Sequence, residues 1–177
     1  MNMEEIKIAS RTIHHGRILN LREDTVRLPD GSKALREVIE HHGGSCVAAL
    51  TEQRELLLVR QFRYGAGKVL WELPAGKLEQ GEDPACCAAR ELIEETGYRA
   101  RRLQSLGRLH PTPAYCQEVI YMYYADELES AQQQLDEGEF LEVSAVPFDT
   151  AVKMVMDGEI TDAKTVIAIL KLKEMLK

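Results

Sequence analysis

Long apolar segments are absent from this sequence. No run approaches the roughly 20 consecutive apolar residues that a membrane-spanning helix requires. The first ten residues, MNMEEIKIAS, also lack the basic and apolar segments that a secretory signal combines. These absences predict a protein that has no membrane partner and works in the cytoplasm.

Cysteine is scarce, with four residues in a chain of 177. Cys46 and Cys116 stand alone, and no two cysteines form a C-x-x-C pair. Cys86 and Cys87 are neighbours in a segment of helical character, where a disulfide between them would be strained. The pattern excludes a disulfide framework and predicts reduced thiols, as in a cytoplasm.

Positive charge is also in short supply. There are 22 lysines and arginines against 29 aspartates and glutamates, for a formal net charge of −7. Such a surface is poorly suited to neutralising the phosphates of a nucleic acid, so we expect no nucleic-acid partner. A small phosphorylated ligand is still compatible with it, because divalent cations can lie between carboxylates and phosphates.

The residues that are present suffice for a packed core. Hydrophobic residues make up 45% of the 177 positions, which suits one compact domain with room for an N-terminal addition. Residues 1–42 have the character of strands, since segment 21–28 and a second strand through Ile39 flank the turn sequence PDGS. Gly43-Gly44 then interrupts the pattern. We expect a strand subdomain at 1–42 and a main domain at 43–177.

The main domain mixes strand-like and helix-like segments. Short apolar runs predict strands at 46–50, 56–59, 69–71, 103–109, 118–125 and 140–146. One helix is predicted from Asp83-Pro84 to Gly97, because these residues suit its N-cap, first turn and C′ position. Further helices are predicted at 148–156 and 162–176. This mixture indicates an α/β fold in which helices cover a sheet.

The segment GKLEQGEDPACCAARELIEETGY, residues 76–98, carries the chemistry. Helical spacing places Glu91, Glu94 and Glu95 on one face. The opposite, core-facing side carries Ala85, Ala88, Leu92 and Thr96. Neighbouring carboxylates repel one another, and a hard divalent cation such as Mg²⁺ would remove that penalty. The alternative is a solvated acidic face on which Arg90 pairs with Glu94.

The surrounding residues favour the cation. The segment matches G-x5-E-x7-R-E-U-x-E-E-x-G-U, where U is bulky and aliphatic, through Gly76, Glu82, Arg90, Glu91, Glu94, Glu95 and Gly97. Tyr98 departs from the last U, which affects packing rather than chemistry. The segment resembles the Nudix box, and the resemblance implies the Nudix α/β/α sandwich with a mixed central sheet. In that family Arg90 and Glu82 would brace the loop and the helix.

The resemblance also implies a metal site. Its principal ligands would be Glu91 and Glu95, with Glu94 assisting and the carbonyl of Ala75 completing the site. The implied cofactor is Mg²⁺, with Mn²⁺ as a substitute. Cations that bridge two phosphates neutralise developing charge and activate a water molecule.

Outside the box, the chain resembles the ADP-ribose pyrophosphatase branch over nearly its full length. Pro113, within the sequence TPA at 112–114, stands sixteen residues after Gly97, where that branch has a Ser-Pro-Gly-like turn. The runs QFR at 61–63 and WELPAG at 71–76 are further marks. By resemblance, the substrate-binding residues would be Arg36, Glu37, Arg63, Thr112, Pro113, Ala114 and Glu118. Taken singly, each also fits an ordinary surface or loop position.

The acidic loop at 135–139 would supply the catalytic base. In this branch a glutamate outside the box accepts a proton from the attacking water, two residues before a further metal-binding glutamate. Glu137 fits the base and Glu139 the ligand, on a loop able to close over substrate. Glu142 is the rival base, and a purely solvent-exposed acidic loop is the alternative without catalysis. We assign no histidine to catalysis.

The reaction implied is Mg²⁺-dependent hydrolysis of ADP-ribose to AMP and ribose 5-phosphate. Two alternatives stay open: hydrolysis of another nucleoside-diphosphate sugar, and a Nudix-fold sensor that binds ADP-ribose without turnover. The N-terminal strands resemble those that exchange between subunits in this branch. A homodimer is therefore expected, in which Arg36 could act on the partner's site.

Overall fold

The computed structural model describes residues 2–177, which form two compact units. The first contains residues 2–43 and Thr112–Glu118. The second contains Gly44–Pro111 and Val119–Lys177. The first unit therefore combines the N-terminal segment with a loop that lies far from it in the sequence.

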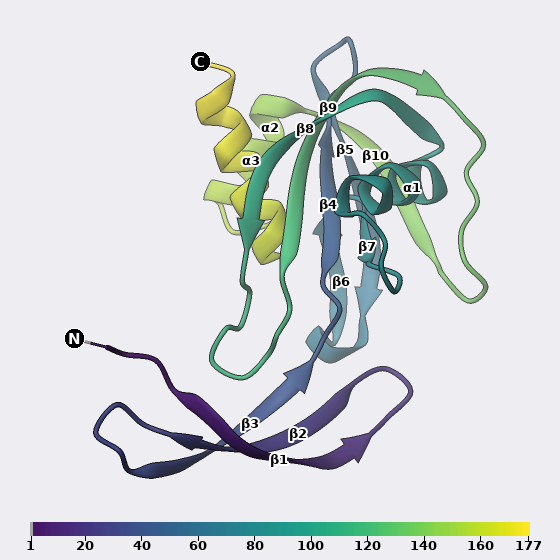
Figure 1. The fold of residues 1–177 in the computed structure, drawn as a ribbon. Helices are drawn as coiled ribbons and strands as arrows, with labels where there is room; N and C mark the ends of the chain where they lie inside the picture. Colours follow the sequence, from purple (N-terminus) through teal and green to yellow (C-terminus); the bar gives the residue numbers. More distant parts are fainter. Residues whose placement is uncertain (1) are drawn as a thin grey trace. The chain divides into compact units, whose positions relative to one another are not determined.

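The first unit is built on an antiparallel sheet with the strand order β1 (Ile6–His15), β2 (Asn20–Arg27) and β3 (Lys33–Glu40) (Figure 1). The turn predicted between β2 and β3 is confirmed, because the Leu28 amide donates to the Ser32 carbonyl at 2.8 Å. Gly31 has a φ of +86° in this turn, a conformation that glycine adopts without strain. The loop joins the sheet through the Ile39 amide, which donates to the Tyr115 carbonyl at 2.7 Å.

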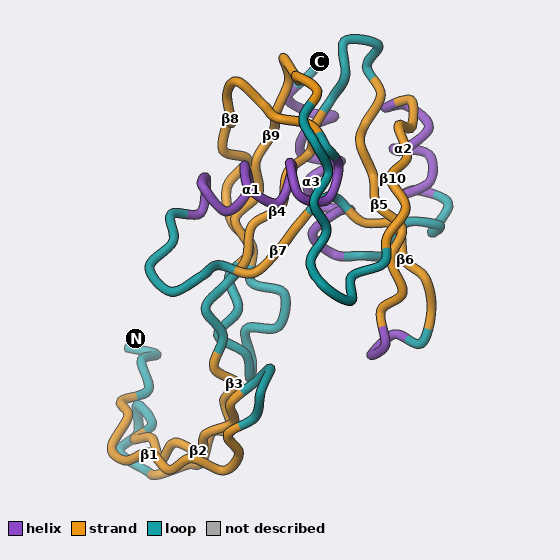
Figure 2. The backbone as a smooth tube through the Cα atoms, turned by 90° about the vertical axis from the view of Figure 1, so that its right-hand side faces the viewer, coloured by secondary structure: helices purple, strands orange, loops and turns teal. Residues whose placement is uncertain are grey.

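The second unit contains two sheets and three helices (Figures 1 and 2). One antiparallel sheet has the order β10 (Leu141–Pro147), β5 (Glu55–Arg63) and β6 (Lys68–Glu72). The other has the order β7 (Ala75–Lys77), β4 (Gly44–Ala49), β9 (Ile120–Ser130) and β8 (Tyr98–Leu109), with β4 and β9 parallel. The helices are α1 (Pro84–Thr96), α2 (Phe148–Met156) and α3 (Ala163–Met175), and η1 (Tyr64–Ala66) joins β5 to β6. The predicted mixed α/β class is confirmed.

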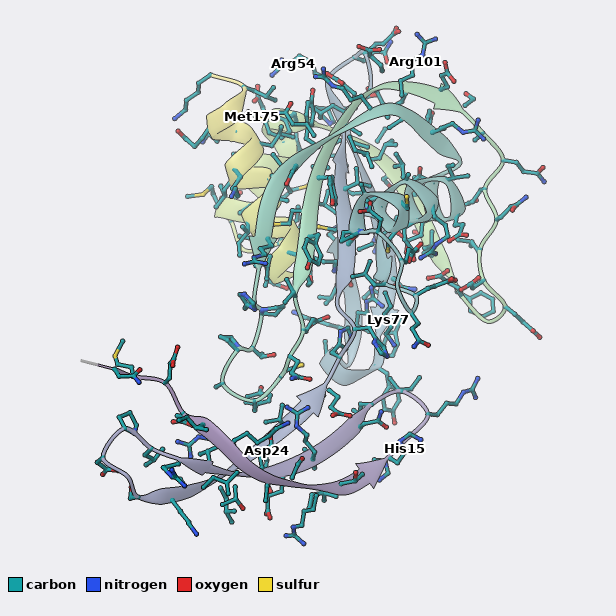
Figure 3. The ribbon with its side chains drawn as sticks, in the orientation of Figure 1. His15, Asp24, Arg54, Lys77, Arg101 and Met175 are labelled. Carbon is teal, nitrogen blue, oxygen red and sulfur yellow. The ribbon has the colours of Figure 1, made fainter. Side chains whose placement is uncertain are left out.

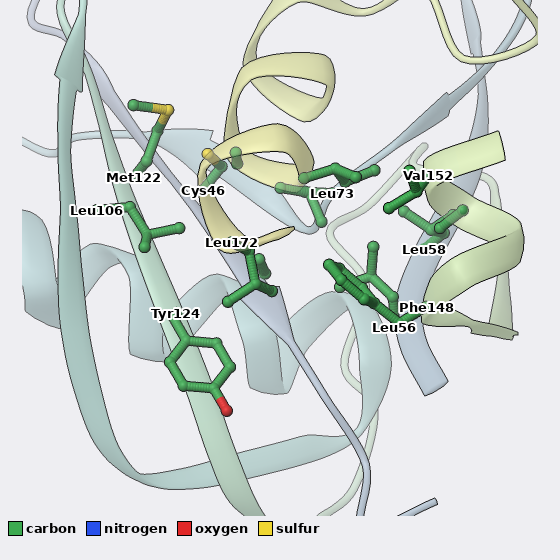
Figure 4. Packing of buried hydrophobic residues seen from close by; sticks show 14 of the residues in the cluster. Cys46, Leu56, Leu58, Leu73, Leu106, Met122, Tyr124, Phe148, Val152 and Leu172 are labelled. Carbon is green, nitrogen blue, oxygen red and sulfur yellow. The ribbon is translucent and has the colours of Figure 1, made fainter. Parts of the chain in front are cut away.

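Strand β4 is buried on both faces because helices cover the unit on two sides. Cys46 and Ala48 belong to the larger apolar cluster, which includes residues of α2 and α3 (Figure 4). Val47 and Ala49 pack on the other face with Leu92 of α1. In Figure 1, α2 and α3 lie on one side of the sheets and α1 on the other. The α/β/α arrangement follows from this alternation.

The helix boundaries agree with the sequence prediction to within one residue, whereas some strand boundaries are wrong. β8 begins at Tyr98, five residues before the predicted start, because its exposed arginines hide the apolar pattern. β9 begins only after Glu118 and continues to Ser130. β7 has three residues, too few to show a period of two. No helix within residues 2–177 is long and apolar enough to cross a membrane.

Candidate active site

Helix α1 is capped at both ends. Oδ1 of Asp83 accepts hydrogen bonds from the amides of Ala85 at 2.9 Å and Cys86 at 3.2 Å. Gly97 follows the last turn with a φ of +72°, and its amide donates to the Ile93 carbonyl at 2.9 Å. Both predicted caps are confirmed. With its ends fixed in this way, the helix directs each of its glutamates to a definite side.

Glu95 of α1 is buried, with 3% of its surface exposed. The amide of Ala75 donates to Oε2 of Glu95 at 3.0 Å. Burial raises the pKa of the Glu95 carboxyl to about 8, and the nearby charges of Glu91 and Glu139 act in the same direction. The alternative of a solvated acidic face is therefore wrong for Glu95, which lies on the buried side together with the expected Leu92.

Arg90 joins helix α1 to the loop before it. Its Nε and Nη2 donate to the two carboxylate oxygens of Glu82 at 3.0 and 3.2 Å. Its Nη1 donates to Glu91 and Glu94, both at 2.8 Å. Its Nη2 also reaches the Lys77 carbonyl at 3.3 Å, where β7 ends (Figure 3). The Arg90–Glu94 ion pair expected for a solvated acidic face is present. The same guanidinium, however, binds three carboxylates and braces the loop.

Gly76 is the point of closest approach between the β7 backbone and the helix. A Cβ atom on Gly76 would lie 1.7 Å from Oε1 of Glu91. Only glycine therefore allows the Glu91 carboxylate to rest against this backbone. The neighbouring Ala75 contacts Glu95, so one short stretch of β7 meets both of the glutamates expected to bind metal.

The segment after β9 brings the acidic loop to this site. The Ala131 amide donates to the Gly97 carbonyl at 2.7 Å, and the Gln134 amide donates to the Glu94 carbonyl at 3.0 Å. These bonds fasten the chain to the C-terminal end of α1. The loop at 135–139 follows directly.

Within the loop, the two candidate glutamates have different environments. Oε1 of Glu139 accepts a hydrogen bond from Nε2 of Gln61 at 3.1 Å, and its charge raises the pKa of Glu95 after the larger effect of burial. Glu137 is exposed and makes no hydrogen bond or ion pair with any residue from 2 to 177. Gly138 between them has a φ of +85°, so the chain turns sharply there.

Glu142, the rival base, lies on the wrong face of its sheet. Its strand pairs with β5 so that Glu142 stands opposite Arg60, to which it forms a 3.4 Å ion pair. Arg60 in turn lies over the Trp71 ring, 5.0 Å from its centroid. Gln61 is the next residue of β5 and points to the other face. The Glu142 side chain, 76% exposed, is therefore directed away from Glu139 and the helix carboxylates.

The donor set fits a divalent cation. Within the described chain, residues 2–177, no three His, Cys, Asp or Glu side chains already form a closed cluster. Glu91, Glu95 and Glu139 are nevertheless electrostatically coupled, and Glu95 is buried beside them without a cationic partner among these residues. Oε1 of Gln61 is also buried and receives no hydrogen bond there. Hard carboxylate oxygens and a spare acceptor suit Mg²⁺ and its bound water.

The expected substrate-binding residues are divided between the two units. In the second unit, Arg63 donates from Nε and Nη2 to the two oxygens of Glu72, at 2.6 and 2.8 Å. In the first unit, Arg36 binds Glu5 at 2.6 Å. The neighbouring Glu37 is exposed.

The other expected substrate residues also belong to the first unit. Thr112, Pro113 and Ala114 form a turn in which the Cys116 amide donates to the Thr112 carbonyl at 3.0 Å. Glu118 lies 3.7 Å from Nε2 of His41. No site role was predicted from the sequence for Gln61, Glu72 or Lys164, because each depends on a partner distant in the sequence. Gln61 binds Glu139, 78 residues away, and Lys164 binds Glu72, 92 residues away.

Comparison with known proteins gives a consistent picture. The NUDIX domain model matches residues 40–168, and the nucleoside diphosphate sugar hydrolase N-terminal domain model matches residues 5–39. The chain is 39% identical over 180 residues to the ADP-ribose pyrophosphatase of Bacillus subtilis (strain 168), covering 99% of this chain and 97% of that protein. It is also 39% identical over 178 residues to the methanol dehydrogenase activator of Bacillus methanolicus, covering 98% and 96%. The crystal structure of an ADP compounds hydrolase superposes with a TM-score of 0.86 at 21% identity, covering 99% and 96%, which shows the fold.

Replacing Gly76 by Ala is expected to weaken Mn²⁺ binding by roughly ten- to a hundredfold. The added methyl group would meet the flexible end of Glu91, so the carboxylate moves while the fold survives. Isothermal titration calorimetry measures the affinity, and thermal unfolding checks the fold. Gly65→Ala is the matched control, because no atom lies within 4 Å of that Cβ. An unchanged affinity in Gly76→Ala would contradict the placement of Glu91.

Proposed function

The chain belongs to the Nudix family, and on this premise we propose that it hydrolyses the pyrophosphate bond of ADP-ribose to AMP and ribose 5-phosphate. One observation supports this most strongly. The buried carboxylate of Glu95 lies with those of Glu91 and Glu139 where β7 meets α1. The choice of ADP-ribose rests on the near full-length similarity to a relative of that name.

The metal would be held by Glu91, Glu95 and Glu139, with Glu94 assisting and the Ala75 carbonyl completing the site. When bound, Mg²⁺, or Mn²⁺ in its place, neutralises phosphate oxygens and makes a water molecule more acidic. The Ala75 amide keeps the Glu95 carboxylate in place. Arg90 holds the loop and Glu94 from the other side.

Glu137 would take the proton from the attacking water. Two features support this role over Glu142. Glu137 directly follows the segment that is hydrogen-bonded to the end of α1. Its carboxylate also has no partner within residues 2–177 that would keep it from approaching the carboxylates of α1. The turn at Gly138 lets the loop bring Glu137 towards a substrate phosphorus. Glu139 would stay with the metal, held by Gln61.

Arg63 is proposed to bind phosphate oxygens, since its Nη1 is left free by Glu72. Arg36, Glu37, the turn at 112–114 and Glu118 are proposed to contact the rest of ADP-ribose. Positioning and charge neutralisation then account for most of the catalysis.

The proposed compartment is the cytoplasm. All four cysteines are free. Burial raises the pKa of Cys46 to about 12 and that of Cys87 to about 11, so both remain protonated thiols. Cysteines that form no disulfide are typical of a reducing compartment.

A substrate panel tests the function. With Mg²⁺ present, ADP-ribose is expected to give the highest kcat/KM among ADP-ribose, ADP-glucose, GDP-mannose and NADH. Release of AMP is measured by chromatography. A higher kcat/KM for another compound of the panel would identify that compound, rather than ADP-ribose, as the substrate. Binding of ADP-ribose without turnover would instead identify a sensor.

Glu137→Gln is expected to lower kcat by about 10² to 10⁴, the range for loss of a general base, with little change in KM. Glu139→Gln should lose activity that added Mg²⁺ partly restores, because a metal ligand is removed. Glu142→Gln is the control, since its side chain lies on the opposite face of the sheet. Normal turnover by Glu137→Gln together with an inactive Glu142→Gln would reverse the assignment.

We also propose that residues 1–42 form a homodimer with exchanged strands. All ten residues of β1 are exposed, and Ile6, Ile8 and Ile13 are among them. β1 is also an edge strand, whose unpaired backbone can accept another chain. Light scattering at micromolar concentration should give about twice the chain mass, in keeping with a twofold assembly.

Mixing two inactive variants tests whether Arg36 acts across the dimer. If it does, refolding Arg36→Ala together with Glu95→Gln should restore about a quarter of the active sites, because half of the dimers are mixed and each has one intact site. A mixture as inactive as its components, or a fully active monomer, would rule out this role.

A further inference from the structure

Glu72 is a buried carboxylate that the proposed mechanism does not use. It is the last residue of β6, and only 1% of its surface is exposed. A buried carboxylate is costly unless it is paired and hydrogen-bonded. Arg63 satisfies both oxygens of Glu72 from one side, at 2.6 and 2.8 Å.

Lys164 satisfies Glu72 from the other side. It is the second residue of α3, its side chain is buried, and its Nζ donates to Oε2 of Glu72. The same Nζ lies 3.0 Å from Oδ2 of Asp162. Two cations and two carboxylates thus form a closed group: Arg63, Glu72, Lys164 and Asp162. Its formal charge is zero, so no buried charge in the group lacks an opposite partner.

A second contact fastens α3 to the same strand end. Oγ1 of Thr165 donates to Asp162 at 2.6 Å and accepts from the Leu73 amide at 2.9 Å. Asp162 also caps α3 by accepting from the Thr165 amide at 3.0 Å. The start of α3 is therefore fixed against residues 72 and 73, directly before the Ala75-Gly76 backbone that meets the helix glutamates.

The charge of Lys164 affects how Arg63 is held. Burial works against ionisation of Glu72, but Arg63 and Lys164 outweigh it and keep the pKa of Glu72 below its usual value. Glu72 therefore stays ionised and accepts from Nε and Nη2, which form one edge of the Arg63 guanidinium. The Nη1 group has no partner among the described residues, and 43% of the side chain is exposed.

The direction of that free group is set by the strand. Arg63 and Gln61 are two residues apart on β5, so both side chains leave the same face of the sheet. Gln61 reaches Glu139 on that face. The charges of Arg63 and Glu95 also influence each other. The free edge of Arg63 is thus presented beside the carboxylate site.

We propose that Lys164 and Glu72 are positioning residues that hold the Arg63 guanidinium with its free edge towards the diphosphate of a nucleoside-diphosphate sugar. Lys164 acts through Glu72, and Glu72 acts through Arg63. The inference rests on the proposed function and assigns to the start of α3 a role in substrate affinity that is separate from metal binding. A purely structural contact would instead change stability without a selective effect on KM.

The test is a double-mutant cycle with Lys164→Met and Arg63→Lys. Lys164→Met replaces the charged side chain by an uncharged one of similar length. Arg63→Lys keeps the positive charge but removes the planar guanidinium. Lys164→Met is expected to raise KM for ADP-ribose by about ten- to a hundredfold, with kcat within about twofold of the parent. In the double variant, KM should not exceed that of Arg63→Lys alone, because both changes remove one interaction.

Controls separate the possible failures. Lys173→Met changes an exposed lysine of the same helix and should leave KM unaltered. Mn²⁺ affinity, measured calorimetrically without substrate, should be unchanged in Lys164→Met. If Lys164→Met is too unstable to assay, Glu72→Gln enters the same cycle with the same expected pattern.

Three results would overturn the inference: a normal KM, KM effects that add in the double variant, or a parallel loss of Mn²⁺ affinity. A parent protein that turns over no nucleoside-diphosphate sugar would instead contradict the proposed function. If ADP-ribose binds without turnover, its dissociation constant replaces KM in the cycle.

Discussion

A carboxylate that has lost its water requires a cation or several hydrogen-bond donors, and Glu95 receives one donor from the described chain, the Ala75 amide. Glu91 and Glu139 add like charge to the same place, which further disfavours ionisation of the buried group. Placing these three carboxylates together lowers the stability of the metal-free fold. Their association would be favourable once a divalent cation is bound, so we propose that the packing of α1 against β7 creates a need for a metal ion.

Two arginines organise the surroundings of this acidic centre in the same way. Arg90 binds Glu82 with one edge and Glu91 and Glu94 with the rest of its fork, and so fixes the loop to the helix. Arg63 binds Glu72 with one edge and leaves Nη1 free. In both cases a carboxylate sets the orientation of a planar guanidinium, because the fork geometry permits two parallel bonds. The first arrangement braces the loop between β7 and α1, and the second is the one proposed to present charge to a ligand.

Local sequence signals predicted the parts of the site that depend on neighbouring residues. Asp83 and Gly97 marked the helix ends correctly. The predicted division of α1 into an acidic face and an opposite core face is wrong at Glu95, which is buried together with Leu92 and Thr96. The burial of Glu95 was not predictable in this way, because it depends on β7, a strand of three residues. The partnership of Glu72 with Lys164 spans 92 positions and has no local pattern. The direction of Glu142 required the register of β10 against β5, which only the folded chain provides.

The proposed chemistry therefore depends on Glu91 and Glu95 of α1 binding a divalent cation. Anomalous diffraction from crystals of the protein grown with Mn²⁺ tests it directly, because the signal locates the metal without reference to activity. We expect a strong anomalous peak in contact with the carboxylate oxygens of Glu91 and Glu95. Crystals that contain Mn²⁺ but show no peak there, with Glu91 still bound to Arg90, would contradict it.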